Sequence, residues 1–327
     1  MNLHIDGFEE FAGEQAPQTA MTRAGYTMGG QWSLVNGREA VGLSTATGSA
    51  ARTLAWTDEK FSVGLAHSFS GRGSVLWLDL GDKRLVLWMN PDSGTPMLNE
   101  QAGGALPTVN RFYYFEIEIA RSTGLATLHI NNRYDMSYSL GSLGDVANVT
   151  ASLGFLEPHS YRPEGMSDAD TGNKFYDDFY MRDGERFGPI TITTRFPTVD
   201  DVAQWFKANP TISHSESVSM HPPKPLDNYL AAATPGLKDA FRSSAPLVSA
   251  NPVLATGIVV MARKSPTLDM KLGVFIGGAD DVDAPLREDT RNVPAEWGTY
   301  YICFDQVDGD TPQGITEAQF GITVEAP

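Results

Sequence analysis

Tyr113-Tyr114-Phe115-Glu116-Ile117-Glu118-Ile119, followed by Leu125-Ala126-Thr127-Leu128-His129-Ile130, is the stretch that decides the fold. In its first part, apolar residues alternate with Glu116 and Glu118, and successive side chains of an extended strand point to opposite faces of a sheet. Ser122-Thr123-Gly124 lies between the two parts and predicts a tight turn, so the pair is expected to form an antiparallel hairpin. We expect one packed face and one face in water, which is typical of an antiparallel sandwich rather than a parallel sheet.

The same pattern recurs on both sides of this hairpin. Residues 75–80 and 84–89 predict a second hairpin around a turn at 81–83, and residues 61–66 predict a further strand. Helical spacing is confined to residues 199–208 and 231–241, which we expect to form short helices or single turns within a β domain. The chain is therefore predicted to be all-β.

The second half of the chain differs in character from the first. Strands are predicted at 188–197, ending at a proline, and after an irregular stretch, 213–225, they resume. The later strands are expected at 255–264, 269–276, 299–306 and 319–324. We therefore expect two domains: a sandwich over residues 1–184 and a smaller β-rich domain over residues 185–327, which would serve for anchoring or oligomerisation.

An ordered set of short motifs resembles the laminin-G/concanavalin-like jelly-roll family. The matching pieces are Asp6-Gly7-Phe8-Glu9, Trp32 with Gly37-Arg38, residues 112–117, residues 124–132 and Tyr176-Asp177-Asp178-Phe179-Tyr180. In that fold the first and last strands are neighbours. The resemblance therefore implies that Gly7-Phe8-Glu9 lies beside Asp178-Phe179-Tyr180.

The way in which the two halves are joined resembles a group of bacteriophage structural proteins. The matching pieces are Asp177-Asp178-Phe179-Tyr180, Arg195-Phe196-Pro197-Thr198, Asp227-Asn228-Tyr229, Ala262-Arg263-Lys264 and residues 317–322, whereas Gln313-Gly314 stands where such proteins often carry a tryptophan. The resemblance implies a non-enzymatic component of the virion, tail-associated or surface-decorating, that is assembled in the host bacterial cytoplasm. Its partners would be other virion proteins and copies of itself.

Charge and composition exclude several classes of partner. The formal net charge of −16 repels a phosphate backbone, so we expect no nucleic-acid binding. The longest apolar run, residues 258–262, is too short for membrane insertion, and residues 1–8 lack the apolar region of a signal peptide. Cys303 is the single cysteine, which excludes an internal disulfide, and its neighbours predict a packed thiol in a buried strand.

The two glutamates of the opening hairpin are the strongest catalytic candidates. Side chains two residues apart on a strand lie ~6.6 Å apart, close to the spacing of a retaining glycosidase pair. Jelly-roll glycosidases, however, use three acids in a Glu-x-Asp-x-Glu run, and Ala120 occupies the third position. A divergent glycosidase is therefore the third functional hypothesis, and no catalytic residue is predicted.

No cofactor is predicted, although calcium remains an alternative because residues 168–173 and 280–283 are rich in oxygen ligands without matching a defined calcium loop. His214 and His221 lie in the irregular stretch and form a weak metal candidate, outweighed by the absence of any ligand spacing. Trp32, Trp56, Trp77 and Trp88 predict either a sugar-stacking platform or, preferably, a subunit interface. The sugar platform supports the second functional hypothesis, a lectin-like module that recognises host surface glycans.

Overall fold

The structure is a computed structural model, and it describes residues 2–14, 17–38, 41–69, 73–90, 93–106, 110–155, 172–220, 223–224, 226–244, 247, 251–278, 281–306 and 311–327. The chain forms two compact units, Met1–Thr193 and Thr194–Pro327. The sequence places the domain boundary after residue 184, and the nine residues that follow belong to the first compact unit. No helix within the described ranges is long and apolar enough to cross a bilayer.

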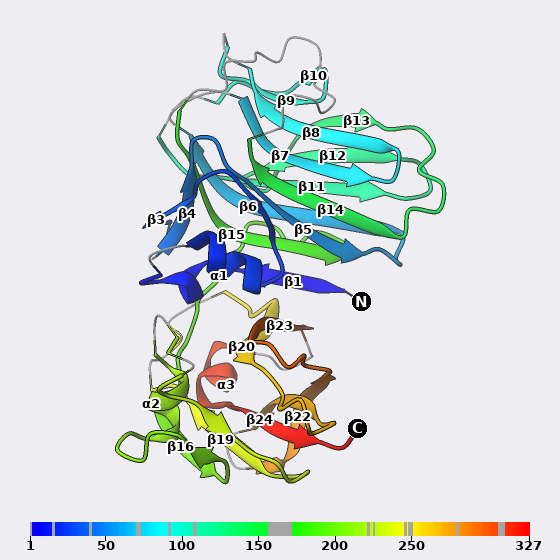
Figure 1. Cartoon of the computed structure of the whole chain (residues 1–327). Helices are drawn as coiled ribbons and strands as arrows, with labels where there is room; N and C mark the ends of the chain where they lie inside the picture. The colour runs from blue at the N-terminus through cyan, green and yellow to red at the C-terminus, as the bar shows by residue number, and fades with distance from the viewer. Residues whose placement is uncertain are drawn as a thin grey trace. The chain divides into compact units, whose positions relative to one another are not determined.

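The first unit is a sandwich of two antiparallel sheets (Figure 1). Within its described residues, one sheet has eight strands, ordered β13-β12-β11-β6-β15-β4-β3 with β1 beside β15. Their bounds are β1 Leu3–Asp6, β3 Ser33–Asn36, β4 Val41–Thr45, β6 Lys60–Phe69, β11 Tyr113–Ala120, β12 Leu125–Ile130, β13 Arg133–Ser139 and β15 Lys174–Asp183. The other sheet, seven-stranded in the described residues, is ordered β10-β9-β8-β7-β14-β5-β2. Its strands are β2 Thr27–Gly29, β5 Ser49–Ala55, β7 Gly73–Leu80, β8 Lys83–Met89, β9 Pro96–Leu98, β10 Gln101–Ala102 and β14 Asn148–Gly154. Between β1 and β2 lie a 3-10 turn, Glu9–Phe11, and the helix α1, Pro17–Arg23.

Both predicted hairpins are confirmed. Strands β11 and β12 pair antiparallel with Phe115 opposite Ile130, and β7 pairs with β8 around Gly81 and Asp82. Asn131 and Asn132 both have positive φ and form the tight turn into β13, a conformation that asparagine tolerates better than most residues.

The predicted closure of the sandwich is also confirmed. Strand β1 lies against β15, with Ile5 opposite Tyr180 and Asp6 opposite Phe179, so Gly7 and Phe8 follow directly beside Asp178. Asp178 itself has φ of 49° and sits at an irregularity in the pairing of β15 with β6. This bulge lets the strand change its partner from β4 to β1.

The core lies between the two sheets. Phe61, Val63 and Leu65 of β6 and Ile117 and Ile119 of β11 alternate along their strands and are at most 1% exposed. The opposite side chains of the same strands form what we call the outer face of the eight-stranded sheet, the side that faces away from the seven-stranded sheet.

Residues 184–192, called the strap here, follow β15 and cross this outer face. The sequence predicted a strand from residue 188 to residue 197, and this prediction is wrong, because the segment has no strand pairing. Instead its backbone N–H groups donate to side-chain oxygens of the sheet, as described below.

The second unit is built around a five-stranded sheet ordered β16-β19-β24-β21-β22, counted over the described residues. Its strands are β16 Val199–Ala203, β19 Lys238–Arg242, β21 Lys271–Gly278, β22 Asp281–Arg291 and β24 Gln319–Glu325. In the described residues, the unit also contains two further strand pairs, two short helices and a small core. The first pair is β17 Phe206–Lys207 with β18 Leu230–Ala231, and the second is β20 Ala255–Ala262 with β23 Gly298–Asp305. The helices are α2 His214–Val218 and α3 Pro312–Glu317. The four strands predicted after residue 254 are present as β20, β21, β23 and β24.

Both predicted helices are wrong, and for a common reason. Residues 199–208 contain β16 and β17, while residues 231–241 contain β19, and β16 pairs antiparallel with β19. Each segment thus obtains its backbone partners from a distant part of the chain, which local spacing cannot reveal. Cys303 lies in β23 as predicted, although it is half-buried rather than buried.

Candidate functional site

Two rows of polar and aromatic side chains cross the outer face of the eight-stranded sheet. They follow the order β15, β6, β11, β12 and β13, which Figure 1 shows side by side. The first row is Tyr180, Gly64, Glu116, His129 and Tyr134, and the second is Arg182, Ser62, Glu118, Thr127 and Ser137. At ~4.8 Å between neighbouring strands, each row is about 19 Å long.

The strap covers the half of this face that belongs to β15 and β6 and reaches Glu116. Tyr114, Glu116 and Tyr180 are at most 3% exposed, and the strap residues Phe187 and Ile190 pack on Tyr114, Tyr180 and Ala66. The sequence placed Glu116 on a face in water, and this prediction is wrong for Glu116, which is 0% exposed. Glu118 keeps a side chain that is 20% exposed.

Four backbone N–H groups of the strap donate to oxygens of the sheet face. The donors and acceptors are Arg186 N to Glu118 Oε2 at 3.1 Å, Phe187 N to the Tyr180 hydroxyl at 3.2 Å, Gly188 N to Glu116 Oε1 at 2.8 Å and Ile192 N to Asp178 Oδ1 at 2.7 Å. These bonds give four backbone N–H groups of the strap an acceptor in place of a strand ladder. The strap is thus bound to the sheet as a peptide would be, through acceptors on the side chains of the sheet.

Charged side chains complete this attachment. Arg186 Nη1 lies 3.2 Å from Glu116 Oε2 and donates to Asn132 Oδ1 at 2.8 Å. Arg38 Nη1 lies 3.0 Å from Asp178 Oδ2 and also donates to the Ile190 carbonyl at 2.9 Å. Two arginines, one on the strap and one on the sheet side, therefore hold the two ends of the strap.

Burial makes the carboxyl groups under the strap reluctant to ionise. Burial raises the pKa of Glu116, although the Tyr180 hydroxyl, which donates to Glu116 Oε1 at 2.7 Å, and the nearby Arg186 act in the opposite direction. Burial and the neighbouring Asp177 raise the pKa of Asp178 to about 7, against the opposing effect of the Ile192 N–H and Arg38. The part of the face under the strap, called the covered half here, therefore carries two carboxyl groups, Glu116 and Asp178, whose ionised forms are costly to bury.

The other half of the same face, on β12 and β13, is open. Tyr134 is 61% exposed, its hydroxyl donates to Ser137 Oγ at 3.3 Å, and the His129 ring packs edge-on against it with centroids 5.9 Å apart. Thr127, His129 and Ser137 are half-buried, so their polar atoms border the exposed ring. Burial lowers the pKa of His129, aided by the positive charge of Arg186. The sequence pointed to the acidic row of β11 but not to Tyr134, whose strand is recognisable only from its cross-strand partners.

The four tryptophans singled out in the sequence lie elsewhere. Trp32, Trp56, Trp77 and Trp88 are at most 6% exposed, so none of them offers an open sugar platform or an open interface. Trp77 and Trp88 form a small cluster with Val86, against which Met97 packs, and the Trp88 indole donates to the Asn99 carbonyl at 2.7 Å.

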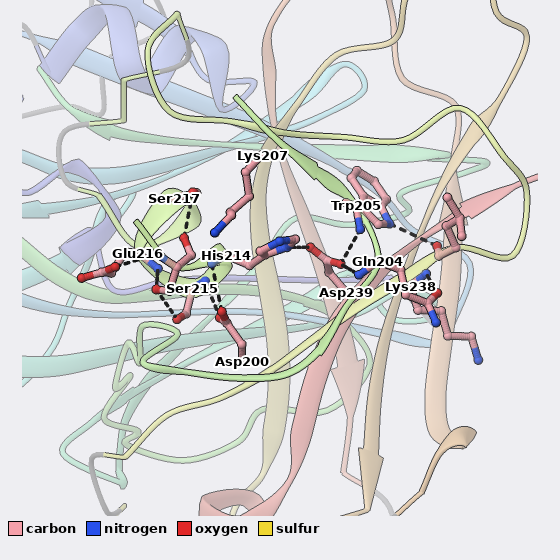
Figure 2. Close-up of polar contacts among 12 residues, drawn as sticks. Asp200, Gln204, Trp205, Lys207, His214, Ser215, Glu216, Ser217, Lys238 and Asp239 are labelled. Carbon is pink, nitrogen blue, oxygen red and sulfur yellow. Dashed lines mark hydrogen bonds and ion pairs between the residues drawn. The ribbon is translucent and has the colours of Figure 1, made fainter. Parts of the chain in front are cut away.

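A second polar cluster lies in the second unit and involves His214. Figure 2 shows the His214 ring pointing at Asp239, and His214 Nδ1 lies 2.6 Å from Asp239 Oδ2. Asp239 Oδ1 also accepts the N–H groups of Gln204 and Trp205, at 2.6 and 2.9 Å. Asp200 accepts hydrogen bonds from the backbone N–H groups of His214 and Ser215 at the start of α2. Burial raises the pKa of Asp200, but these hydrogen bonds outweigh burial, and the net effect is a lowered pKa. Through these bonds the cluster joins β16, the turn after it, α2 and β19.

Metal candidates find no support in the described part of the chain. No group of three or more His, Cys, Asp or Glu side chains is placed to hold an ion within the ranges given above. His221, residues 168–171 and Asp280 lie outside the described residues, as do the side chains of Asp281 and Asp283; Asn173, at the end of the first calcium candidate, is exposed.

Comparison with known proteins gives similarity of fold only. No family model matches the chain, and no curated protein matches it. Among solved structures, the metal-free carbohydrate recognition domain of Emp46p is 11% identical over 54% of this chain and 95% of its own, with a TM-score of 0.38. An alginate lyase, Aly36B, in complex with alginate trisaccharide is 12% identical over 55% of this chain and 98% of its own, with a TM-score of 0.40. A sialidase is 9% identical over 46% of this chain but only 17% of its own, with a TM-score of 0.33. The predicted fold class, an all-β chain with a concanavalin-like jelly-roll sandwich, is confirmed.

Proposed function

We propose that the sandwich is a lectin-like carbohydrate-binding module and that the open half of its outer face is the binding site. The observation that carries this proposal is Tyr134, an aromatic ring that is 61% exposed and bordered by the polar side chains of Thr127, His129 and Ser137. A sugar presents apolar C–H faces, which pack on aromatic rings, and hydroxyl groups, which exchange hydrogen bonds with such neighbours.

Binding is tested with a glycan array that contains bacterial surface sugars, followed by calorimetry on the best ligand. Tyr134→Ala is expected to weaken that ligand by about tenfold or more, because the stacking surface is lost. Tyr138→Ala is the matched control, since Tyr138 lies on the same strand opposite Ala126, on the other face of the sheet. An array without hits, or equal losses in the two variants, would contradict the proposal.

We further propose that the glutamates of β11 act structurally rather than as a catalytic pair. Both are engaged: Glu116 by Tyr180, Arg186 and Gly188, and Glu118 by the Arg186 N–H and by Lys60 Nζ at 3.2 Å. If a polysaccharide-cleaving activity were found, the Glu116→Gln, Glu118→Gln protein would be expected to retain it. Loss of that activity in a protein that still folds would overturn this part of the proposal.

A second candidate function, assembly through protein–protein contacts, is favoured by the second unit. Phe206, Leu226 and Leu286 are 67%, 82% and 70% exposed, and large apolar side chains of this kind are common in the contacts between proteins. Exposed side chains of this kind suit the anchoring or self-association expected of a virion component. The test is to look for the protein in purified particles: a fixed stoichiometry would support this function, and absence from the particles would exclude it.

A further inference from the structure

We propose that the strap is a displaceable cover and that it occupies a groove for neutral oligosaccharides that continues the open site. This inference rests on the proposed function and deepens it, because it extends the same two rows of side chains from Tyr134 to Tyr180. The open site would then be the exposed end of a longer one.

The part of the sheet face beneath the strap, which would form the groove once the strap moves away, has the composition of a ligand site. It presents two tyrosine rings, Tyr114 and Tyr180, with two carboxyl groups beside them, Glu116 and Asp178. All four side chains are at most 3% exposed. Apolar residues would cover the outer face of a sandwich without the cost of burying a carboxyl group, which is offset here by the hydrogen bonds that Glu116 and Asp178 accept.

The strap fills this groove with the groups that a sugar would supply. Phe187 packs on the Tyr180 ring with centroids 5.1 Å apart, and the strap N–H groups of Gly188 and Ile192 donate to Glu116 and Asp178. Sugar hydroxyls are donors of the same kind, and sugar C–H faces pack on tyrosine as Phe187 does. The strap therefore stands in for a saccharide at both the apolar and the polar contacts.

The charge of the groove selects the class of sugar. Every acceptor named here is a carboxyl group or a hydroxyl group, and Asp177 adds a third buried carboxyl group beside Asp178. A sugar carboxylate could only accept, as these carboxyl and hydroxyl oxygens do, and Arg38 is already paired with Asp178, whereas the hydroxyl groups of a neutral sugar can donate to them. The strap itself is attached without a strand ladder, so its removal leaves the hydrogen bonds between the strands intact.

The experiment weakens the strap and measures binding of maltohexaose, cellohexaose and mannohexaose by calorimetry. Phe187→Ala removes the ring from Tyr180, and Phe187→Ala with Gly188→Pro also removes the N–H that binds Glu116, at a residue whose φ of 88° proline cannot adopt. Pro189→Ala, at an exposed strap residue, is the matched control. Circular dichroism checks the fold, and Phe187→Ala alone serves if the double variant does not fold.

We expect both strap variants, but not Pro189→Ala, to bind at least one hexasaccharide about tenfold or more tightly than the unmodified chain, because the fraction of binding-competent molecules rises. The gain should disappear when Tyr114→Ala is added. Hydrogen exchange of the Ile192 amide should accelerate in the same variants, which separates strap release from a change in the open site.

The outcomes separate this inference from the proposed function. If the unmodified chain binds through Tyr134 and the strap variants show no gain in affinity, the inference is overturned and the proposed function stands. If only the strap variants bind, the inference is supported, and the proposal that the open half alone binds a glycan is contradicted. If no variant binds any of the hexasaccharides, the proposal that the strap covers a binding groove is overturned.

Discussion

The covered and the open halves of the outer face are built from the same rows of side chains but differ in how their polar groups are satisfied. Under the strap, Glu116 and Asp178 are at most 1% exposed and depend on protein donors. On β12 and β13, His129, Thr127 and Tyr134 remain accessible to water in whole or in part. The difference shows that polar residues on the outer face of a sheet need hydrogen-bond partners. Water provides them on the open half, and the backbone of the strap provides them on the covered half.

The largest expected effect comes from removing the acceptor at the centre of the covered half. Glu116→Ala should lower the free energy of unfolding by about 3 kcal/mol or more, because the Tyr180 hydroxyl and the Gly188 N–H lose their buried acceptor. Urea unfolding measures the loss, and hydrogen exchange of the β11 amides assigns it to the sandwich.

Glu118→Ala is the matched control for that prediction. Its partner Lys60 is about one-third exposed, and exposed ion pairs contribute only about 0.5 kcal/mol. Equal losses in Glu116→Ala and Glu118→Ala would show that burial does not distinguish the two positions as described.

A pH titration sharpens the same comparison through Asp178. Its pKa in the folded chain, about 7, lies above the ordinary value of 3.8, so its contribution to stability is complete below pH 3.8 and is lost as the pH rises through 7. Asparagine carries no charge, still accepts from the Ile192 N–H and tolerates the φ of 49°. The stability of Asp178→Asn relative to the unmodified chain should therefore increase from pH 4 to pH 8, by about 1–4 kcal/mol.

The comparison between variant and unmodified chain matters in this titration because His67 acts in the opposite direction. Burial lowers the pKa of His67 to about 3, so its contribution is present above pH 6.5 and is lost as the pH falls towards 3. Both proteins share His67, and its effect cancels in the difference. A constant difference across the pH range would contradict the raised pKa of Asp178.

The sequence predicted the sandwich well because its strands are local and strongly alternating. The hairpins of β7–β8 and β11–β12 and the pairing of β1 with β15 follow from residues that the motifs named. The strap could not be predicted in the same way. Residues 184–192 have an extended, proline-marked pattern that suits a strand equally well, and only the position of Glu116 and Asp178 in space shows where their N–H groups bind.

The second unit shows the same limit more strongly. Strands β16 and β19 lie 39 residues apart from first residue to first residue, and each carries a spacing that favours a short helix. Their pairing and the bonds from Asp239 to Gln204 and Trp205 outweigh that local preference. Residues 281–283, part of an oxygen-rich stretch in the sequence, begin β22, whose pairing with β21 is irregular near Gly277 and Pro285.

A smaller loss of stability is expected from a substitution at Gly64, the glycine of β6 beneath Tyr180. Gly64 lies directly beneath the Tyr180 ring, and a Cβ at this position would overlap that ring. Gly64→Ala should lower the free energy of unfolding by about 1–3 kcal/mol, since the Tyr180 ring, on which Phe187 packs, would have to shift. Faster exchange of the Gly188 amide would accompany the loss, and an unchanged exchange rate would argue that Tyr180 and the strap are not coupled.

The smallest effect on stability is expected at the open end of the same row. Tyr134→Ala should change the free energy of unfolding by no more than about 0.5 kcal/mol, because the ring is largely in water and its hydrogen bond to Ser137 is exposed. The same variant is expected to cause the largest loss of glycan affinity among the open-site changes. A residue that binds a ligand and does little for the fold produces this combination. If Tyr134→Ala instead destabilised the sandwich as much as Gly64→Ala, Tyr134 would belong to the packing of the sheet edge, and the open half would be no freer than the covered one.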